Sequence, residues 1–285
     1  MKKKFVSIGG ETLAYTEVGA GEPILLIHGN FSSGVFYKDL YDRLEDRFRC
    51  IAPDMRGFGD STYNRRFDTL GELADDLALF LDTLGLKSVY TVGWSLGGGV
   101  AMELAARHPD KVKKLFVVEG VGCKGYPLFK DDGSRYKDKT ELLQNAAVGP
   151  MLVAIEGKMF DAIDAAFDAT IHTVGKPDKE ESKRLYSETF KQRCLVDADW
   201  ALAVFNMSDE DTPYTPTDHG CKKIKCPVGL TLADSDVIVP NQMVLDNIEA
   251  IGEKATVFEY ARCGHSPFVD CPDKIAADIA EFFGN

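Results

Sequence analysis

Residues 89–109 read VYTVGWSLGGGVAMELAARHP. The stretch opens with a β-branched apolar run, passes through one serine among four glycines, and continues with the composition of a helix. At a sharp turn between a strand and a helix, a serine projects above the sheet, and larger residues two positions to either side would clash. The pattern Gly-x-Ser-x-Gly over residues 93–97 therefore predicts that Ser95 is a nucleophile held at such a turn, a nucleophile elbow.

Two other interpretations of Ser95 are a helix cap and a glycine-rich phosphate loop. An ordinary N-cap needs no glycine two residues upstream. The stretch also lacks the lysine of G-x-x-x-x-G-K-[ST], and no G-x-G-x-x-G pattern is present. Both alternatives therefore explain less of the pattern than a nucleophile does.

Short apolar runs alternate with helical patterns on both sides of this stretch. Residues 5–8 and 12–17 flank Gly9 and Gly10 and predict a hairpin. Helical patterns cover residues 69–84, with Thr69 and Glu72 at capping-box spacing, and also residues 241–251 and 272–283. Apolar runs typical of strands buried on both faces lie at residues 23–27, 48–52, 89–92, 114–118, 228–232 and 255–260. This alternation predicts an α/β fold with a mostly parallel sheet.

Residues 123–220 interrupt the alternation, because they contain few strand-like runs. Such a segment is too long for a plain loop. We predict a helical cap, or lid, over residues 123–220, inserted into a core of residues 1–122 and 221–285. Within it, Gly149–Pro150 and residues 175–177 are expected to separate helices at residues 142–148, 151–174, 180–195 and 199–207.

A serine nucleophile needs a base, and His265 is the best candidate because it follows the last expected strand. His28 directly follows another strand and belongs to a different motif. His108 lies about 20 Å from Ser95 by helix rise, and His172 and His219 lie in or beside the insertion.

An acid must hold the imidazole in the right tautomer. Asp236 follows the expected strand at residues 228–232 and lies at the same end of the sheet as His265, so it is the favoured acid. Asp234 and Glu119 are alternatives. The order Ser95, Asp236, His265 is the order of nucleophile, acid and base in α/β-hydrolases.

The developing negative charge on a substrate carbonyl also needs hydrogen-bond donors. The turn of residues 28–31 follows a strand that should lie beside the one before Ser95. We expect the backbone N–H groups of Asn30 and Leu96 to form the oxyanion hole, and the aromatic side chains of Phe31, Trp94 and Phe268 to bind substrate.

The composition indicates which kinds of partner and cofactor this protein is expected to lack. The 285 residues carry a formal net charge of −12, which disfavours nucleic acid. Seven cysteines without a CxxC pair and five scattered histidines predict reduced thiols and no metal site. No apolar run is long enough for a signal peptide or a membrane span, so the expected location is the cytoplasm. The oligomeric state is not predicted.

Five motifs together resemble the α/β-hydrolase superfamily. They are LLIHGN (25–30), PDMRGFGDS (53–61), GWSLGG (93–98), LADSDVIVP (232–240) and GHSPFVDCP (264–272). The resemblance implies an eight-stranded, mostly parallel sheet flanked by helices, with the cap after strand six. Serine at position 95 departs from the haloalkane dehalogenases and epoxide hydrolases of this fold, which place aspartate there. HGNFS departs from the HGGPG of proline iminopeptidases.

HGNFSSG (28–34), GWSLGG and GHSPF (264–268) are also similar to one branch of N-acyl-homoserine lactonases of this fold. We therefore expect a carboxylesterase or lactonase that acts on a small molecule, forms an acyl-enzyme and needs no cofactor. The alternatives are a hydrolase of C–C bonds in β-diketone-like substrates, a cofactor-free haloperoxidase-like activity, and a non-catalytic ligand-binding receptor.

Overall fold

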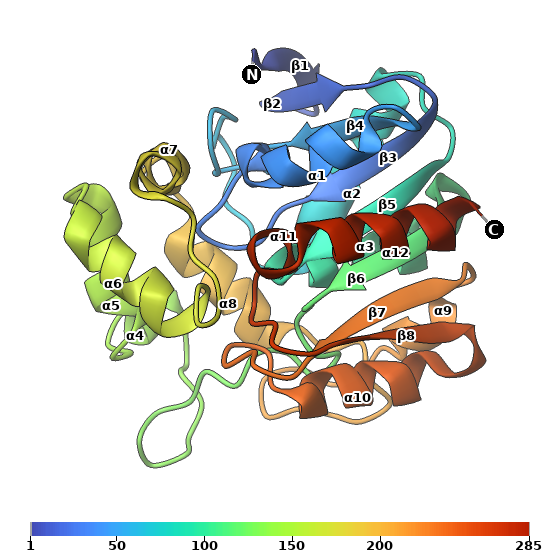
Figure 1. Ribbon diagram of the computed structural model, residues 1–285. Coiled ribbons are helices and arrows are strands. Elements are labelled where there is room, and N and C mark those ends of the chain that lie inside the picture. Colours follow the sequence, from blue (N-terminus) through green and yellow to red (C-terminus); the bar gives the residue numbers. More distant parts are fainter. Residues whose placement is uncertain (1, 285) are drawn as a thin grey trace.

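Eight strands form one sheet in the order β1-β2-β4-β3-β5-β6-β7-β8 in the computed structural model, which describes residues 2–284 (Figure 1). β2 pairs antiparallel with β1 and β4, and the other neighbours are parallel. The predicted sheet is therefore confirmed. The strands are β1 Lys4–Ile8, β2 Glu11–Val18, β3 Glu22–Ile27, β4 Phe48–Pro53, β5 Val89–Trp94, β6 Val112–Val118, β7 Val228–Ala233 and β8 Ala255–Tyr260.

Helices cover both faces of the sheet, which explains the continuous apolar runs. In β3, Ile24 and Leu26 belong to one hydrophobic core and Leu25 and Ile27 to the other, and all four are fully buried. One face is covered by α1 Lys38–Leu44, α11 Pro267–Asp270 and α12 Pro272–Gly284, and the other by α2 Leu70–Thr83, α3 Leu96–Arg107, α9 Gly220–Lys223 and α10 Asn241–Ile251. Short 3-10 helices are η1 Gly34–Tyr37, η2 Pro109–Lys111 and η3 Gly252–Lys254.

Local signals in the sequence behave as predicted. The hairpin between β1 and β2 turns through Gly9 and Gly10, whose φ angles are 42° and 92°. Helix α2 begins after Thr69, and the Glu72 carboxylate accepts a hydrogen bond from the Thr69 backbone N–H at 3.2 Å. Both predictions are confirmed.

Five of the six described helices between β6 and β7, all except α9, gather on one side of the sheet, coloured green to tan in Figure 1. They are α4 Lys139–Leu142, α5 Val148–Glu156, α6 Phe160–Thr170, α7 Lys179–Thr189 and α8 Leu195–Val204. Helix α8 places Ala198, Ala201 and Leu202 in the core that α2 and α3 share, so it connects this group of helices to the sheet region.

Several expectations for these helices are wrong. The helices expected at residues 180–195 and 199–207 are Lys179–Thr189 and Leu195–Val204. The single helix expected at residues 151–174 is two helices, because the chain turns at Gly157 and at Lys158, whose φ is 51°. Gly149 and Pro150 do not separate helices but lie in the first turn of α5, where proline needs no N–H partner. Most of residues 142–148 accordingly form turns before α5 begins.

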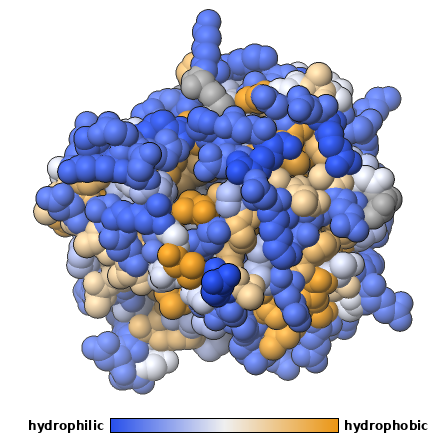
Figure 2. Space-filling model, in the orientation of Figure 1, coloured by the Kyte–Doolittle hydropathy of each residue, from blue (hydrophilic) through white to orange (hydrophobic). Residues whose placement is uncertain are grey.

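The surface in the orientation of Figure 1 is largely hydrophilic, with smaller apolar patches between the polar side chains (Figure 2). Among the helices of residues 2–284, none combines the length and the apolar character that crossing a membrane requires.

Candidate active site

Ser95 lies between β5 and α3 in a strained backbone conformation, with φ of 57° and ψ of −123°. A β-carbon on Gly93 would lie 2.3 Å from the Gly97 carbonyl oxygen. A β-carbon on Gly97 would lie 2.2 Å from the carbonyl oxygen of Ile27. Since real side chains never come this close to backbone, the predicted need for glycine at both positions is confirmed.

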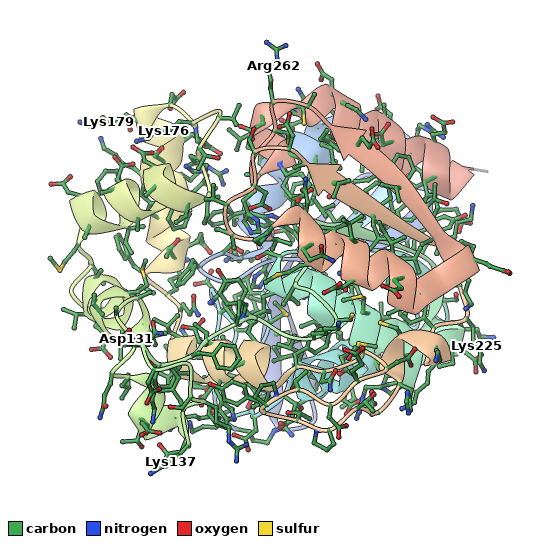
Figure 3. The ribbon with its side chains drawn as sticks, turned by 90° about the horizontal axis from the view of Figure 1, so that it is seen from below. Asp131, Lys137, Lys176, Lys179, Lys225 and Arg262 are labelled. Atoms are coloured by element: carbon green, nitrogen blue, oxygen red, sulfur yellow. The ribbon has the colours of Figure 1, made fainter. Side chains whose placement is uncertain are left out.

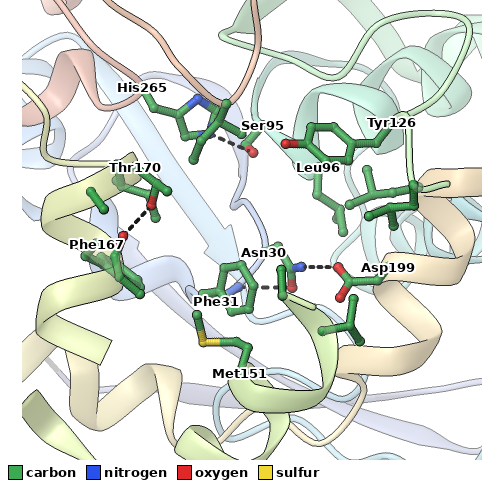
Figure 4. Close-up of a pocket in the computed structure, with 18 of the residues that line it drawn as sticks. Asn30, Phe31, Ser95, Leu96, Tyr126, Met151, Phe167, Thr170, Asp199 and His265 are labelled. Atoms are coloured by element: carbon green, nitrogen blue, oxygen red, sulfur yellow. Dashed lines mark hydrogen bonds between the residues drawn. The ribbon is translucent and has the colours of Figure 1, made fainter. Parts of the chain in front are cut away.

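Three side chains from the carboxyl ends of β5, β7 and β8 meet at this turn. His265 Nε2 lies 2.9 Å from Ser95 Oγ (Figure 4). His265 Nδ1 lies 2.7 Å from Asp236 Oδ2. The side chains of His265 and Asp236 are only 2% and 0% exposed. The structure thus brings together the predicted nucleophile, base and acid in one hydrogen-bonded chain.

The charge of Asp236 determines which way these hydrogen bonds run. Burial favours its neutral form, but the charge of His265, the hydrogen bond from His265 and those from two backbone N–H groups outweigh burial and lower the pKa of Asp236. The backbone donors are Ile238 at 2.7 Å and Val239 at 3.0 Å. An ionised carboxylate only accepts, so Nδ1 donates to Asp236, and in the neutral form of the ring Nε2 then accepts the hydroxyl proton of Ser95. This arrangement can remove that proton when Ser95 attacks.

The two alternative acids have other partners. Asp234 is exposed and accepts hydrogen bonds from the backbone N–H groups of Arg262 and Cys263, so it braces the turn before His265. Glu119 is fully buried and accepts a hydrogen bond from Thr231 Oγ1 at 2.6 Å. Burial, together with the nearby charge of Asp236, raises the pKa of Glu119 well above its usual range. Among the described carboxylates, Asp236 is the one hydrogen-bonded to His265.

His28, the rival base, has both ring nitrogens occupied. Its Nδ1 donates to the Gly29 carbonyl at 2.8 Å, and its Nε2 accepts from the Met55 N–H at 3.0 Å. Complete burial lowers the pKa of His28 to about 4. His28 therefore connects two turns as a neutral ring and is not free to act as a base.

The predicted oxyanion donors lie on either side of Ser95. β3 and β5 pair with Ile27 opposite Gly93, which brings the turn after β3 to the serine. Asn30 and Leu96 both line the cavity in front of Ser95, and their backbone N–H groups donate to no group within residues 2–284. These N–H groups are free to bind a ligand oxygen.

The Asn30 side chain is held by residues from the segment between β6 and β7. Its Nδ2 donates to Asp199 Oδ1 at 2.9 Å, and its Oδ1 accepts from Gln192 Nε2 at 2.7 Å. Gln192 Oε1 also accepts from the Phe31 N–H at 3.0 Å (Figure 4 shows the Asn30 and Asp199 contact). Sequence reasoning missed Asp199 and Gln192. The signal for Asp199 was that it is one of two acids, with Asp197, in a largely apolar helix, LVDADWALAV.

A cavity of about 470 Å³ opens in front of Ser95. Phe31 and Trp94 line it as expected, and Met151 and Phe167 extend it into α5 and α6 (Figure 4). Phe268 does not line this cavity: its ring packs edge-on behind Trp94, with 5.6 Å between the ring centroids. Much of the far wall is alanine, from Ala146, Ala147, Ala154, Ala162, Ala166 and Ala169.

Away from the cavity, three carboxylates converge at Asp54, Asp60 and Glu188. The Lys3 ammonium lies among them, at 2.7 Å, 2.8 Å and 2.6 Å from their oxygens. A protein cation therefore already balances these charges and joins the chain's start to α7.

The fold and this arrangement of side chains define a hydrolase of the α/β-hydrolase superfamily, and comparisons with known proteins agree. A family model described as "alpha/beta hydrolase fold" matches residues 22–144. Haloalkane dehalogenase 2 of Mycobacterium tuberculosis is 40% identical over 272 residues, which cover 95% of this chain and 91% of that protein. The chain belongs to this superfamily.

Two further similarities have lower identity. Cis-3-alkyl-4-alkyloxetan-2-one decarboxylase of Shewanella oneidensis is 27% identical, over 99% of this chain and 88% of that protein. The crystal structure of the enol-lactonase from Burkholderia xenovorans LB400 superposes with a TM-score of 0.76 at 18% identity, covering 99% of this chain and 100% of that one. The second similarity shows a shared fold.

Proposed function

We propose that this chain hydrolyses a small carboxylic ester or lactone through an acyl-enzyme on Ser95. The observation that carries the proposal is the hydrogen bond of 2.9 Å between His265 Nε2 and Ser95 Oγ, with Asp236 behind the ring. His265 takes the hydroxyl proton as Ser95 Oγ bonds to the substrate carbonyl carbon. The N–H groups of Asn30 and Leu96 stabilise the negative oxygen that results.

The second half of the reaction uses the same groups. His265 gives its proton to the departing alcohol oxygen, which leaves an ester between the acyl group and Ser95. His265 then accepts a proton from water, the water oxygen attacks the acyl carbon, and Ser95 Oγ departs with that proton. Side chains and water supply every step, so the proposal includes no cofactor.

Dehalogenation is not proposed, although a haloalkane dehalogenase is among the relatives. A carboxylate that displaces a halide forms an ester, which water can hydrolyse at its carbonyl carbon. Ser95 would instead form an alkyl ether, which has no carbonyl for water to attack. The serine thus favours substrates that already contain a carbonyl group.

Lactones belong in the substrate class for two reasons. The name of the Shewanella oneidensis relative denotes oxetan-2-ones, which are four-membered lactones. A lactone also has the same reacting carbonyl as an ester. We further propose that residues 123–220 are a cap that selects the substrate for a core of residues 1–122 and 221–285, since Met151 and Phe167 line the cavity.

A substrate panel for wild type and Ser95→Ala tests this function. We expect hydrolysis of short p-nitrophenyl esters or lactones by the wild type, and a loss of at least about 10³-fold in Ser95→Ala. An unchanged melting temperature would show that the variant is folded. Activity that survives in Ser95→Ala would refute the mechanism. Turnover of β-diketones or of peroxide with halide, without ester or lactone turnover, would favour the alternative enzymes, and binding without turnover would favour a receptor.

A further inference from the structure

The cavity beside Ser95 contains a carboxyl group that the proposed reaction does not use. It belongs to Asp199 on α8, a residue that lines the cavity and is 8% exposed (Figure 4). Its Oδ1 accepts the hydrogen bond from Asn30, but its Oδ2 accepts none from any residue in the range 2–284. One oxygen of this carboxyl is therefore available to a ligand.

A neighbouring acid on the same helix shows what a purely structural carboxylate looks like here. Asp197 lies 2.7 Å from Arg66 Nη2 and 2.7 Å from Lys139 Nζ, and it also accepts from the Tyr63 hydroxyl. No described lysine or arginine lies within ion-pair distance of Asp199. Burial raises the pKa of Asp199 to about 7, while the Asn30 hydrogen bond lowers it. A buried carboxylate without a counter-ion is costly, and a bound cation would remove that cost.

Basic side chains are missing from the cavity wall. The described lining residues include no lysine or arginine, and His265 is the one histidine among them. Lys176 and Lys179 are exposed at the outer edge of the molecule (Figure 3), and Lys176 pairs with Asp164 and Asp168. The formal net charge of −12 adds a negative background. Apart from His265 and the N–H groups of Asn30 and Leu96 beside Ser95, nothing on the wall would therefore compensate an anionic group of a substrate.

We propose that Asp199 makes this cavity selective for substrates whose apolar part carries a protonated amine, and against substrates that carry a carboxylate. The amine donates to the free Oδ2 of Asp199, while the apolar chain packs against the alanines of α5 and α6. The inference depends on the proposed hydrolysis in one respect only, namely that the bound ligand is a substrate. Recognition of the cation depends on Asp199 alone.

Calorimetry on the Ser95→Ala protein tests the selectivity without turnover. The probes are hexylammonium, 1-hexanol and hexanoate, which share one apolar chain, at pH 8, where most of Asp199 is ionised. The pKa values of the nearby Tyr126 and Cys194 are raised by burial, so both stay neutral. His265 is present in every variant compared, so a difference between variants does not come from it. We expect hexylammonium to bind most tightly and hexanoate most weakly.

The variant Asp199→Asn keeps the shape of the side chain and an oxygen for Asn30 but removes the charge. In the Ser95→Ala background it should weaken the binding of hexylammonium by about tenfold or more, as expected for a lost hydrogen bond to a charged group. The affinity for 1-hexanol should change little. Thr170→Val is the matched control, because the Thr170 hydroxyl lines the same cavity but already donates to the Ala166 carbonyl at 2.6 Å. It should leave the ratio of the hexylammonium and hexanoate dissociation constants unchanged.

Three results would overturn the inference. They are hexanoate binding as tightly as hexylammonium, a ratio that Asp199→Asn does not change, and no binding of any probe at millimolar concentration. If Asp199 merely held Asn30 in place, all probes would weaken together. Binding of hexylammonium through Asp199 in a protein whose wild type hydrolyses no ester or lactone would refute the proposed function and leave this ligand site standing.

Discussion

Asp236 and His265 form a buried pair in which the carboxylate accepts the Nδ1–H of the imidazole at 2.7 Å. Asp236→Asn keeps the shape of the side chain but can turn the ring to the wrong tautomer. We expect the variant to lose about 10⁴-fold in kcat, with a melting temperature close to that of the wild type. Steady-state kinetics with a p-nitrophenyl ester measure the loss. A fall of less than tenfold would mean that another group orients His265.

Glu119 should behave as a neutral acid that supports the site without entering the reaction. Glu119→Gln keeps the hydrogen-bonding shape, so we expect its kcat to stay within a fewfold of the wild type. The raised pKa of Glu119 comes from burial and the charge of Asp236, so ionisation is harder in the folded state than in the unfolded chain. The protonated Glu119 therefore contributes stability to the folded state. This contribution is fully present below the pKa of Glu119 in the unfolded chain and is lost as pH rises through its pKa in the folded protein.

The glutamine variant cannot ionise and escapes that loss. Its free energy of unfolding relative to the wild type should therefore increase as pH is raised from about 5 to about 9. Urea unfolding at several pH values measures the difference. Parallel pH profiles for the two proteins would contradict the assignment of a raised pKa to Glu119.

Gln192 should influence catalysis through the Asn30 turn. Gln192→Leu has a similar size but removes hydrogen bonds to Asn30 Oδ1 and to the Phe31 N–H, so the oxyanion donor loses its support. We expect kcat to fall by about 10-fold to 10²-fold, less than for a lost donor, with a smaller change in KM. Gln144→Leu changes an exposed glutamine of the same segment and should have no effect. Equal kinetics for both variants would show that the contact does not support the turn.

Lys3 should stabilise the fold through the carboxylates of Asp54, Asp60 and Glu188. Lys3→Met leaves these charges with fewer partners and should cost about 1–3 kcal/mol of unfolding free energy at pH 7. Lys2→Met, at an exposed position, is the control. Burial opposes ionisation of Glu188 and Asp60, but hydrogen bonds from Lys3 and Lys191 lower both pKa values.

For groups with lowered pKa values, the stabilisation is present above the unfolded pKa and is lost as pH falls. The difference between wild type and Lys3→Met should therefore shrink as pH drops from 7 to about 3. Thermal or urea unfolding across this range measures it. A difference that stays constant with pH would indicate that Lys3 acts through packing.

The sheet was predictable because its signals are local. Strands buried on both faces need unbroken apolar runs. The turn at Ser95 needs glycine at positions 93 and 97 because a side chain there would clash with backbone a few residues away or in the adjacent strand. The break between α5 and α6 was harder to see. It depends on Lys158 adopting a positive φ, which its residue type does not suggest.

The candidate site likewise contains residues that the sequence predicts and residues that it does not. Ser95, Asp236 and His265 each follow a strand at one edge of the sheet, so topology alone places them together. Asp199 and Gln192 lie 169 and 162 residues after Asn30 in the sequence. They reach it because α8 and the residues just before it pack against the core. Phe268 differs from its expected role because Trp94 comes between it and the cavity. No sequence period encodes such contacts.

Labelling with a serine-directed fluorophosphonate tests the central claim most directly. Ser95 Oγ should attack the phosphorus with His265 as base, and intact mass should show one added group. Peptide mapping should place that group on Ser95, Ser95→Ala should stay unlabelled, and His265→Ala should react far more slowly. Labelling of another residue, or equal labelling of wild type and Ser95→Ala, would contradict the claim that Ser95 is the nucleophile.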